Sequence, residues 1–371
     1  MTIVVLGAGM VGRSIALDLA KDYTITSFDL DSNNLNLLKK ANPDIKTNNA
    51  DLSQFQEYKN WLSPFDLVIT AVPGFMGYKT LEAVINAGKN VVDISFFPED
   101  ALQLDKLAKE KNVTAITDCG VAPGMSNFII GRWNEEMKID SFACYVGGLP
   151  KERKPPFQYK APFSPVDVIQ EYIRPARLVE KGKIVTKPAL SDRELIEFEN
   201  TGILEAFNTD GLRSLIYTMK HIPYMLEKTL RYPGHIELII ALKQAGFFHE
   251  SALNFDGKKI TPLDFTSKLL IDEWKLQPDD EEFTVMKVIL KSENKTVVYD
   301  LYDQYDLVTK TSSMARTTGY TCTAAANLIA KGLFTKKGIF PPELVGNDKR
   351  CFDFVMDYLA ERNVNWKISE R

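Results

Sequence analysis

The sequence predicts an α/β fold in which an N-terminal Rossmann domain, a doubly wound parallel sheet, is followed by an α+β domain with a mainly antiparallel mixed sheet. Between residues 3 and 117, short apolar runs typical of strands buried on both faces alternate with helical patterns. A glycine-rich turn, Gly7–Gly12, follows the first of these runs. Further along the chain, pairs of apolar runs are separated by short turns, which indicates hairpins and therefore antiparallel pairing.

The elements of the first domain follow in chain order. The expected strands are Ile3–Leu6, Thr24–Phe28, Asp66–Ala71, Asn90–Ile94 and Val113–Thr117. The expected helices include Ile15–Leu19, Leu35–Lys40, Leu81–Ala87 and Ala101–Lys109. Gly88 suits the end of the third helix, because a glycine in the left-handed conformation commonly caps a helix.

The pattern changes after Val121–Gly124. Phe142–Val146 reads as a strand, and the alternation in Phe157–Phe163 predicts a half-buried strand. Two hairpins are expected, Ala176–Val179 with Lys183–Thr186 and Phe283–Leu290 with Val297–Leu301. The expected helices are Ile236–Gln244, Pro262–Trp274 and Ala324–Ala330.

Composition narrows the class of protein. The 371 residues are 45% hydrophobic and 25% charged, as in ordinary globular domains. A formal net charge of −4 argues against nucleic-acid binding, and no apolar stretch is long enough to span a membrane. The four cysteines are far apart, which suits reduced thiols and no metal site. No signal peptide is visible, so we expect a cytoplasmic protein.

The turn Gly7-Ala8-Gly9-Met10-Val11-Gly12 is a complete G-x-G-x-x-G between a predicted strand and a predicted helix. Gly7 permits the tight turn, Gly9 lets backbone approach a pyrophosphate, and Gly12 lets the helix pack close to the strand. The helix N-terminus, from Met10 and Val11, offers free N–H groups to phosphate. The alternative is a tight turn without a ligand.

Asp29 ends the second strand, where a carboxylate would meet the ribose 2′-hydroxyl of the cofactor. A 2′-phosphate would be repelled there, so the sequence favours NAD over NADP. Asp29 or Asp31 could instead cap the next helix. Ala71, Val72 and Pro73 close a later strand and are expected to face the nicotinamide. Asp51 is expected near the adenine or in a solvated loop.

Six further segments carry a family resemblance. They are Asp118–Asn127, Gly147–Pro150, Tyr172–Ala176, Phe207–Gly211, Thr229–His235 and Met314–Thr318. In this order they resemble the saccharopine dehydrogenase-like family, and within it most closely the L-lysine 6-dehydrogenases. The resemblance covers nearly the whole chain.

The resemblance implies three regions. These are a Rossmann domain at 1–120, a substrate and dimerisation domain at 121–312, and a helical segment at 313–371 that packs back on the first domain. It also implies a homodimer. The implied reaction is NAD-dependent oxidation of the ε-amine of lysine to a semialdehyde, which cyclises to piperideine-6-carboxylate.

An arginine fork is the natural partner of a substrate α-carboxylate. Arg231 is the first candidate, and Arg213, Arg174 and Arg316 follow, each with a structural salt bridge as its alternative. Thr318 completes the expected substrate contacts.

His235 is the leading candidate for proton transfer, ahead of His221, although a core or capping role is equally open. Asp93 and Asp210 could orient an ammonium group. Cys119 and Gly120 are expected beside the cofactor at the domain junction, with the Cys119 thiol packed rather than reactive.

Two alternatives to lysine oxidation stay open. One is a saccharopine reductase, and the other is a catalytically silent NAD-binding regulator. Saccharopine reductases carry an aspartate where this chain has Ala122 and a cysteine where it has Val146. Both changes remove polar groups, which favours a pocket for the methylene stem of lysine over one for a tricarboxylate.

Overall fold

The computed structural model describes residues 1–277 and 280–371. The chain divides into two compact units. The first unit comprises residues 1–139, 213–220 and 314–365, and the second comprises 140–212, 221–313 and 366–371. The first segment of the first unit therefore ends at residue 139, later than the boundary expected at residue 120. Residues 366–371 belong to the second unit.

The first unit is built on a seven-stranded parallel sheet in the order β17-β6-β5-β4-β1-β2-β3. Its strands are β1 (Thr2–Leu6), β2 (Thr24–Asp29), β3 (Lys46–Asn49), β4 (Leu67–Thr70), β5 (Asn90–Asp93), β6 (Thr114–Ile116) and β17 (Gly338–Phe340). The strand order reverses beside β1, where the carboxyl ends of β1 and β4 form the crevice that binds ligands in such sheets.

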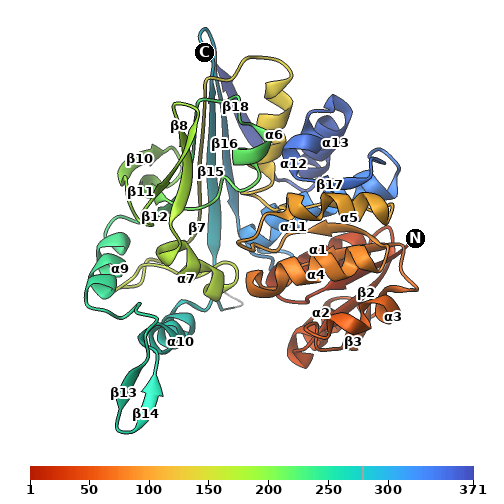
Figure 1. The fold of residues 1–371 in the computed structure, drawn as a ribbon, viewed down its shortest axis with the longest axis horizontal. Coiled ribbons are helices and arrows are strands. Elements are labelled where there is room, and N and C mark those ends of the chain that lie inside the picture. Colours follow the sequence, from red (N-terminus) through yellow and green to blue (C-terminus); the bar gives the residue numbers. More distant parts are fainter. Residues whose placement is uncertain (278–279) are drawn as a thin grey trace. The chain divides into compact units, whose positions relative to one another are not determined.

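The helices of the first unit are drawn with these strands in Figure 1. They are α1 (Met10–Leu19), α2 (Ser32–Ala41), α3 (Tyr58–Leu62), α4 (Gly74–Asn86), α5 (Asp105–Glu110), α6 (Met125–Asn134), α8 (Leu215–Thr218), α11 (Ser313–Ala330), α12 (Pro342–Gly346) and α13 (Lys349–Ala360), with 3₁₀ turns at Phe55–Glu57 and Ala101–Leu104. Helices α3, α4 and α5 bury apolar side chains against Val68 and Val91 of the sheet.

The second unit is built on a nine-stranded mixed sheet in which only β12 and β7 pair in parallel among the described residues. Its strands are β7 (Ser141–Pro150), β8 (Ala176–Glu180), β9 (Lys183–Lys187), β10 (Glu194–Phe198), β11 (Gly202–Asn208), β12 (Tyr224–Arg231), β15 (Glu282–Lys291), β16 (Thr296–Gln304) and β18 (Trp366–Glu370). The predicted fold class, a parallel Rossmann sheet plus a mainly antiparallel mixed sheet, is confirmed.

In the part of the second unit that the structure describes, the helices are α7 (Pro165–Ile173), α9 (His235–Gln244) and α10 (Pro262–Trp274). A separate hairpin, β13 (Leu253–Phe255) with β14 (Lys258–Ile260), extends away from the large sheet (Figure 1). This hairpin pairs only with itself within the described part of the chain.

The strand predicted at Phe157–Phe163 is wrong. These residues form turns and bends, with one isolated bridge from Ala161 to Lys275. The alternation arose because the aromatic rings of Phe157 and Tyr159 both pack against Trp274. Side-chain burial without strand pairing therefore imitated the period of a strand.

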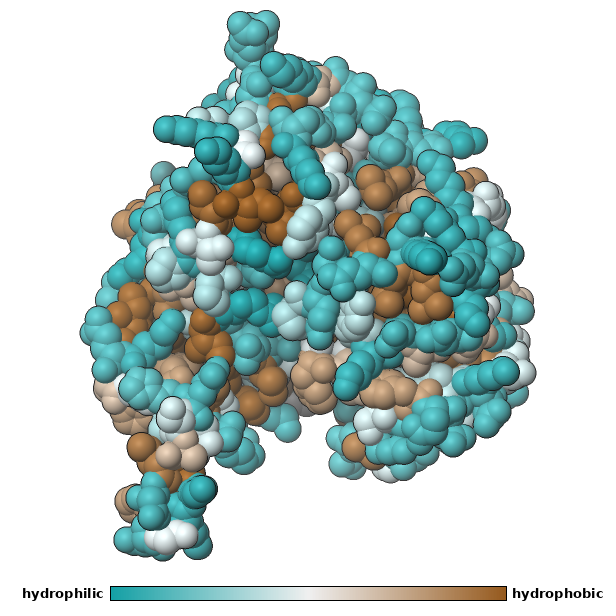
Figure 2. All heavy atoms as spheres, viewed as in Figure 1, coloured by the Kyte–Doolittle hydropathy of each residue, from teal (hydrophilic) through white to brown (hydrophobic). Residues whose placement is uncertain are grey.

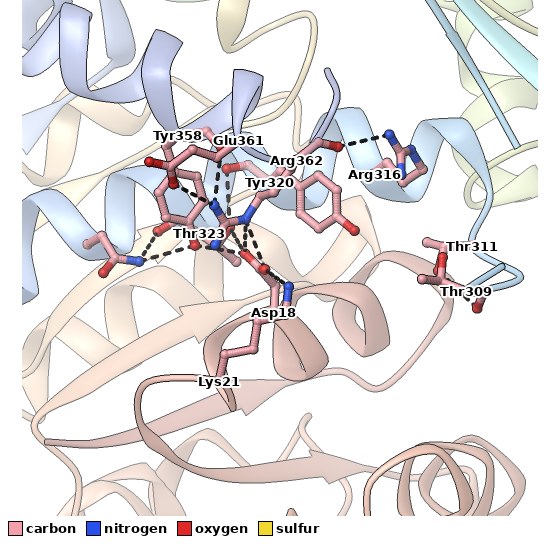
Figure 3. Close-up of polar contacts among 11 residues, drawn as sticks. Asp18, Lys21, Thr309, Thr311, Arg316, Tyr320, Thr323, Tyr358, Glu361 and Arg362 are labelled. Carbon is pink, nitrogen blue, oxygen red and sulfur yellow. Dashed lines mark hydrogen bonds and ion pairs between the residues drawn. The ribbon is translucent and has the colours of Figure 1, made fainter. Parts of the chain in front are cut away.

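A buried carboxylate ties α1 to the C-terminal helices of the first unit. Asp18, on α1, is only 2% exposed. Its carboxylate accepts hydrogen bonds from Thr323 at 2.7 Å, Tyr358 at 2.7 Å and Arg362 at 2.9 Å, and from Lys21 at 2.9 Å (Figure 3). Burial by itself would raise the pKa of Asp18, but these hydrogen bonds, from Arg362 above all, hold it below its ordinary value.

Candidate active site

The glycine turn between β1 and α1 has the backbone that a dinucleotide requires. Gly7 has φ +104°, and a Cβ there would collide with the carbonyl oxygen of Ala71. A Cβ at Gly12 would collide with the carbonyl oxygen of Gly7, so α1 packs directly against the turn. At Gly9 an added Cβ meets nothing within 4 Å, which leaves the open approach that a pyrophosphate needs.

Asp29 stands beside this turn, at the carboxyl end of β2. One carboxylate oxygen accepts from the backbone N–H of Ala8 at 2.6 Å, and the other accepts from the N–H of Asp31 at 2.7 Å. Asp31, and not Asp29, caps α2 by accepting from the N–H of Asn33 at 2.8 Å. The Asp29 carboxylate is thus held against the glycine turn, where it can reach a ribose hydroxyl.

The other expected cofactor residues lie along the same edge of the sheet. Ala71, Val72 and Pro73 follow β4 and lead directly into α4. Asp51 follows β3 and accepts hydrogen bonds from Ser53 and Gln54, which lower its pKa. Met10 and Val11 begin α1 as expected.

Asp93 lies at the carboxyl end of β5 and is completely buried. Its Oδ1 accepts from the Thr70 hydroxyl at 2.5 Å, and its Oδ2 has no hydrogen-bond partner among the described residues. Burial raises its pKa to about 7, and the nearby Asp118 adds to this rise. Because this carboxyl group has no exposed surface, it cannot itself contact a substrate.

Cys119 and Gly120 follow β6. The Cys119 thiol is completely buried, and burial raises its pKa, so it is packed rather than reactive. Gly120 lies against Thr318 on α11, since a Cβ at Gly120 would stand 3.2 Å from the Thr318 methyl group. The structure therefore brings these residues together within the first unit.

Arg231 and His235 lie in the core of the second unit. The Arg231 side chain is 2% exposed, and its nitrogens donate to the Tyr172 hydroxyl at 3.0 Å, the Leu230 carbonyl at 2.9 Å and Glu171 at 2.9 Å. Its guanidinium also lies 4.3 Å from the centre of the Tyr159 ring. These contacts favour a structural role for Arg231 over the expected carboxylate anchor.

His235 continues this network. Its Nε2 lies 3.0 Å from the Tyr172 hydroxyl and its Nδ1 lies 2.9 Å from the Phe157 carbonyl. Because Tyr172 already accepts from Arg231, its O–H donates to Nε2, and Nδ1–H donates to the carbonyl. Burial, followed by the charge of Arg231, lowers the pKa of His235 to about 3. A histidine held neutral in this way is unsuited to the proton transfer expected of it.

The remaining candidates are dispersed. Asp210 accepts three hydrogen bonds from Arg177, at 2.8 to 3.1 Å, within the second unit. Arg174 directly follows α7 and is half-buried. Arg316 donates to the carbonyl of Arg362 at 3.0 Å, and His221 is exposed. None of these contacts singles out a substrate-binding group.

Two family models match the chain. One, described as the saccharopine dehydrogenase NADP binding domain, matches residues 3–116, and the other, the saccharopine dehydrogenase C-terminal domain, matches residues 120–364. The chain belongs to the saccharopine dehydrogenase family. Its first unit is therefore a nucleotide-binding dehydrogenase domain, which agrees with the geometry of the glycine turn.

Relatives in this family include the mouse mitochondrial alpha-aminoadipic semialdehyde synthase, 24% identical over 73% of this chain and 31% of that protein. The NADP(+), L-glutamate-forming saccharopine dehydrogenase of Schizosaccharomyces pombe is 26% identical over 68% of this chain and 60% of that protein. The chain thus spans about a third of the mouse relative. Apo saccharopine dehydrogenase from Saccharomyces cerevisiae has the same fold, with a TM-score of 0.81, 20% identity and coverage of 100% and 99% of the two chains.

In the described residues, no helix is both long and apolar enough to cross a membrane. In those same residues, no group of three or more histidine, cysteine or acidic side chains is placed to hold a metal ion.

Sequence reasoning missed Asp118 as a partner for Arg213. The two side chains form an ion pair at 2.8 Å within the first unit, and both are nearly inaccessible to solvent. A family motif containing Asp118 was visible in the sequence, but the 95 residues between the partners hid the pairing.

Proposed function

We propose that this member of the saccharopine dehydrogenase family is an NAD-dependent amine dehydrogenase that oxidises the ε-amine of L-lysine. The observation that carries the proposal is the Asp29 carboxylate held against an open G-x-G-x-x-G turn. That arrangement suits a dinucleotide with free ribose hydroxyls.

The preference for NAD rests on charge. Residues 29–34 read Asp-Leu-Asp-Ser-Asn-Asn, with two acids and no lysine or arginine. A 2′-phosphate beside Asp29 would be repelled, whereas ribose hydroxyls can donate to the carboxylate. Relatives such as the S. pombe enzyme are named for NADP, so this preference would separate the chain from them.

The chain's own residues supply binding and orientation. Asp29 would hold the ribose, Gly9 would admit the pyrophosphate, and the N-terminus of α1 would face the phosphates. Bound NAD would accept the hydride that leaves the carbon carrying the amine. Loss of the hydride and of a proton from nitrogen leaves an imine, which water would hydrolyse with release of ammonia. The α-amine of the resulting semialdehyde would then condense with the aldehyde, with loss of water, to give piperideine-6-carboxylate.

The preference for lysine rests on two small apolar residues, Ala122 and Val146, where the saccharopine reductases carry polar ones. Val146 lies on β7 and is 8% exposed. Apolar side chains at these two positions favour the methylene groups of a substrate over its carboxylates, and each methylene is worth about 0.8 kcal/mol on burial. Saccharopine reductase is the second candidate, and the names of several relatives favour it.

The deciding experiment is a steady-state assay of the purified protein with L-lysine and with saccharopine, each with NAD and with NADP, following the absorbance of the reduced cofactor. The proposal expects the highest kcat/KM for lysine with NAD. A higher kcat/KM for saccharopine would refute the lysine assignment. Tight NADH binding with no oxidation of any amine would instead indicate the silent regulator.

We also propose a homodimer formed through the second unit. Apolar side chains gather on the β13–β14 hairpin and the neighbouring α10, where Leu253, Phe255, Phe265 and Leu269 are all more than half exposed (Figure 2). An isolated two-stranded hairpin is only marginally stable in water, so burial against a second copy would stabilise it. Sedimentation equilibrium of the wild type and of Phe255→Ser tests this, with a monomeric wild type as the refuting result.

A further inference from the structure

Arg213 joins two loops at the carboxyl edge of the parallel sheet. Its Nη2 donates to Asp118 Oδ1 at 2.8 Å and its Nε to the same oxygen at 3.1 Å, while Nη1 donates to the Phe97 carbonyl. Asp118 follows β6 and Phe97 follows β5. One guanidinium therefore bridges the loops that leave neighbouring strands.

Arg213 and Asp118 both have an unusual backbone conformation. Arg213 has φ +51° and Asp118 has φ +54°. Residues with side chains adopt this left-handed region rarely, and such residues concentrate at functional sites, where the surrounding contacts enforce them. The ion pair is itself enclosed, since the two side chains are 3% and 5% exposed.

The two loops border the cofactor residues already described. Cys119, next to Asp118, donates its N–H to the Asp93 carbonyl at 2.9 Å. The guanidinium carbon lies 5.0 Å from the centre of the Phe96 ring and 5.1 Å from that of Phe97. Phe97 is completely buried, and a Cβ at Gly77 on α4 would stand 2.6 Å from its ring. The position of Phe96 and of the Cys119–Gly120 backbone therefore depends on Arg213.

We propose that the Asp118–Arg213 pair is a positioning device for hydride transfer, in which Arg213 fixes the Phe96 and Cys119–Gly120 loops that border the nicotinamide. The proposal deepens the proposed function and rests on it. Arg213 is then not a substrate anchor, because each of its three guanidinium nitrogens already donates to an acceptor within the first unit.

The test compares Arg213→Lys and the milder Asp118→Asn with the wild type. Lysine at 213 keeps the charge but loses the planar fork that reaches both loops. The matched control is Arg350→Lys, whose wild-type guanidinium forms a 2.7 Å ion pair with Asp348 on the exposed surface of the same unit. The measurements are thermal melting, kcat and KM for lysine, the dissociation constant of NADH, and the emission spectrum of bound NADH.

In the two test variants, we expect kcat to fall about 10- to 100-fold, the loss that a misplacement of about 1 Å can cause. KM and the NADH dissociation constant should stay within about threefold, since neither side chain is expected to touch these ligands. The emission of bound NADH should shift, because the surroundings of the nicotinamide change. Arg350→Lys should match the wild type in every measurement.

Two results would overturn the proposal. A large rise in KM with unchanged kcat would make Arg213 a substrate anchor. Lowered melting temperature with wild-type kcat per folded molecule and wild-type NADH emission would make the pair purely structural. If the wild type oxidises neither lysine nor saccharopine, the proposed function fails by itself, and the NADH emission of the variants still tests the positioning role.

Discussion

Replacing Asp18 with asparagine should destabilise the first unit strongly. The carboxylate is almost fully enclosed and pairs with Arg362, whose side chain is 12% exposed. The variant keeps the shape of the side chain but leaves a largely buried guanidinium whose remaining acidic partner, Glu361 at 3.7 Å, is exposed to solvent. Removing one partner of a buried ion pair costs about 3–5 kcal/mol. At roughly 2–4 °C per kcal/mol for a unit of this size, the melting temperature should fall by about 6–20 °C.

The effect of Asp18→Asn should depend on pH in a defined direction. The folded pKa of Asp18 is lowered below the unfolded value of about 4, so its stabilisation is fully present above that value. It is lost as the pH falls through the folded pKa. The difference in stability between wild type and variant should therefore be constant from about pH 5 to pH 8 and should narrow below about pH 4.

Thermal melting followed by circular dichroism measures both effects. Asp22→Asn is the matched control, because it removes the same charge from an exposed position just beyond the end of α1. The reasoning is refuted if Asp18→Asn costs less than about 1 kcal/mol at pH 7, or if it costs no more than Asp22→Asn. Either outcome would mean that the network in Figure 3 is replaced by solvent at little cost.

The remaining predictions concern the cofactor site and the buried Arg231 and His235 side chains of the second unit. Asp29→Ala should weaken NAD binding by about 1.5–3 kcal/mol and reduce discrimination against NADP, measured as kcat/KM with each cofactor; unchanged discrimination would contradict the ribose contact. Arg231→Lys should lower the melting temperature while KM for lysine stays within about threefold. A rise in KM without a change in melting temperature would instead show that Arg231 binds the substrate carboxylate. His235→Asn should leave the shape of the pH–rate profile unchanged between pH 5 and pH 9, because the folded histidine is already neutral there; loss of an inflection would show that it titrates during turnover. In the wild type, the same lowered pKa should reduce stability as the pH falls below about 6.5, where only the unfolded chain takes up the proton.

The sequence predicted local features well where one short segment carries the whole signal. The glycine turn, the strand before it and Asp29 lie within residues 2–29, and their geometry follows from the backbone freedom of Gly7 and the length of β2. Two hairpins of the second unit, β8–β9 and β15–β16, were likewise predicted from apolar runs around short turns, whereas β10–β11 and β13–β14 were not. These are local properties, so a single sequence is enough.

The roles of the buried charges could not be predicted in this way. Arg231 and His235 stood next to each other in a polar cluster and suggested a site, yet their partners, Glu171 and Tyr172, come from α7 about 60 residues earlier. Arg213 pairs with Asp118, which lies 95 residues earlier in the chain. A buried ion pair and a substrate anchor require the same residue types, and only the fold shows which acceptor is within reach.

The division of the chain has a consequence for its synthesis on the ribosome. The backbone passes from one unit to the other at residues 139–140, 212–213, 220–221, 313–314 and 365–366. The edge strand β17 and helices α11 to α13 reach the first unit only after most of the second has been made, and β18 completes the second sheet last of all. Neither unit can therefore finish folding until residue 365 has been synthesised, and contacts so distant in sequence are expected to form slowly. The edges of β6 and β16 stay unpaired until β17 and β18 have been made, so the nascent chain should depend on chaperones more than a protein whose domains follow one another along the sequence.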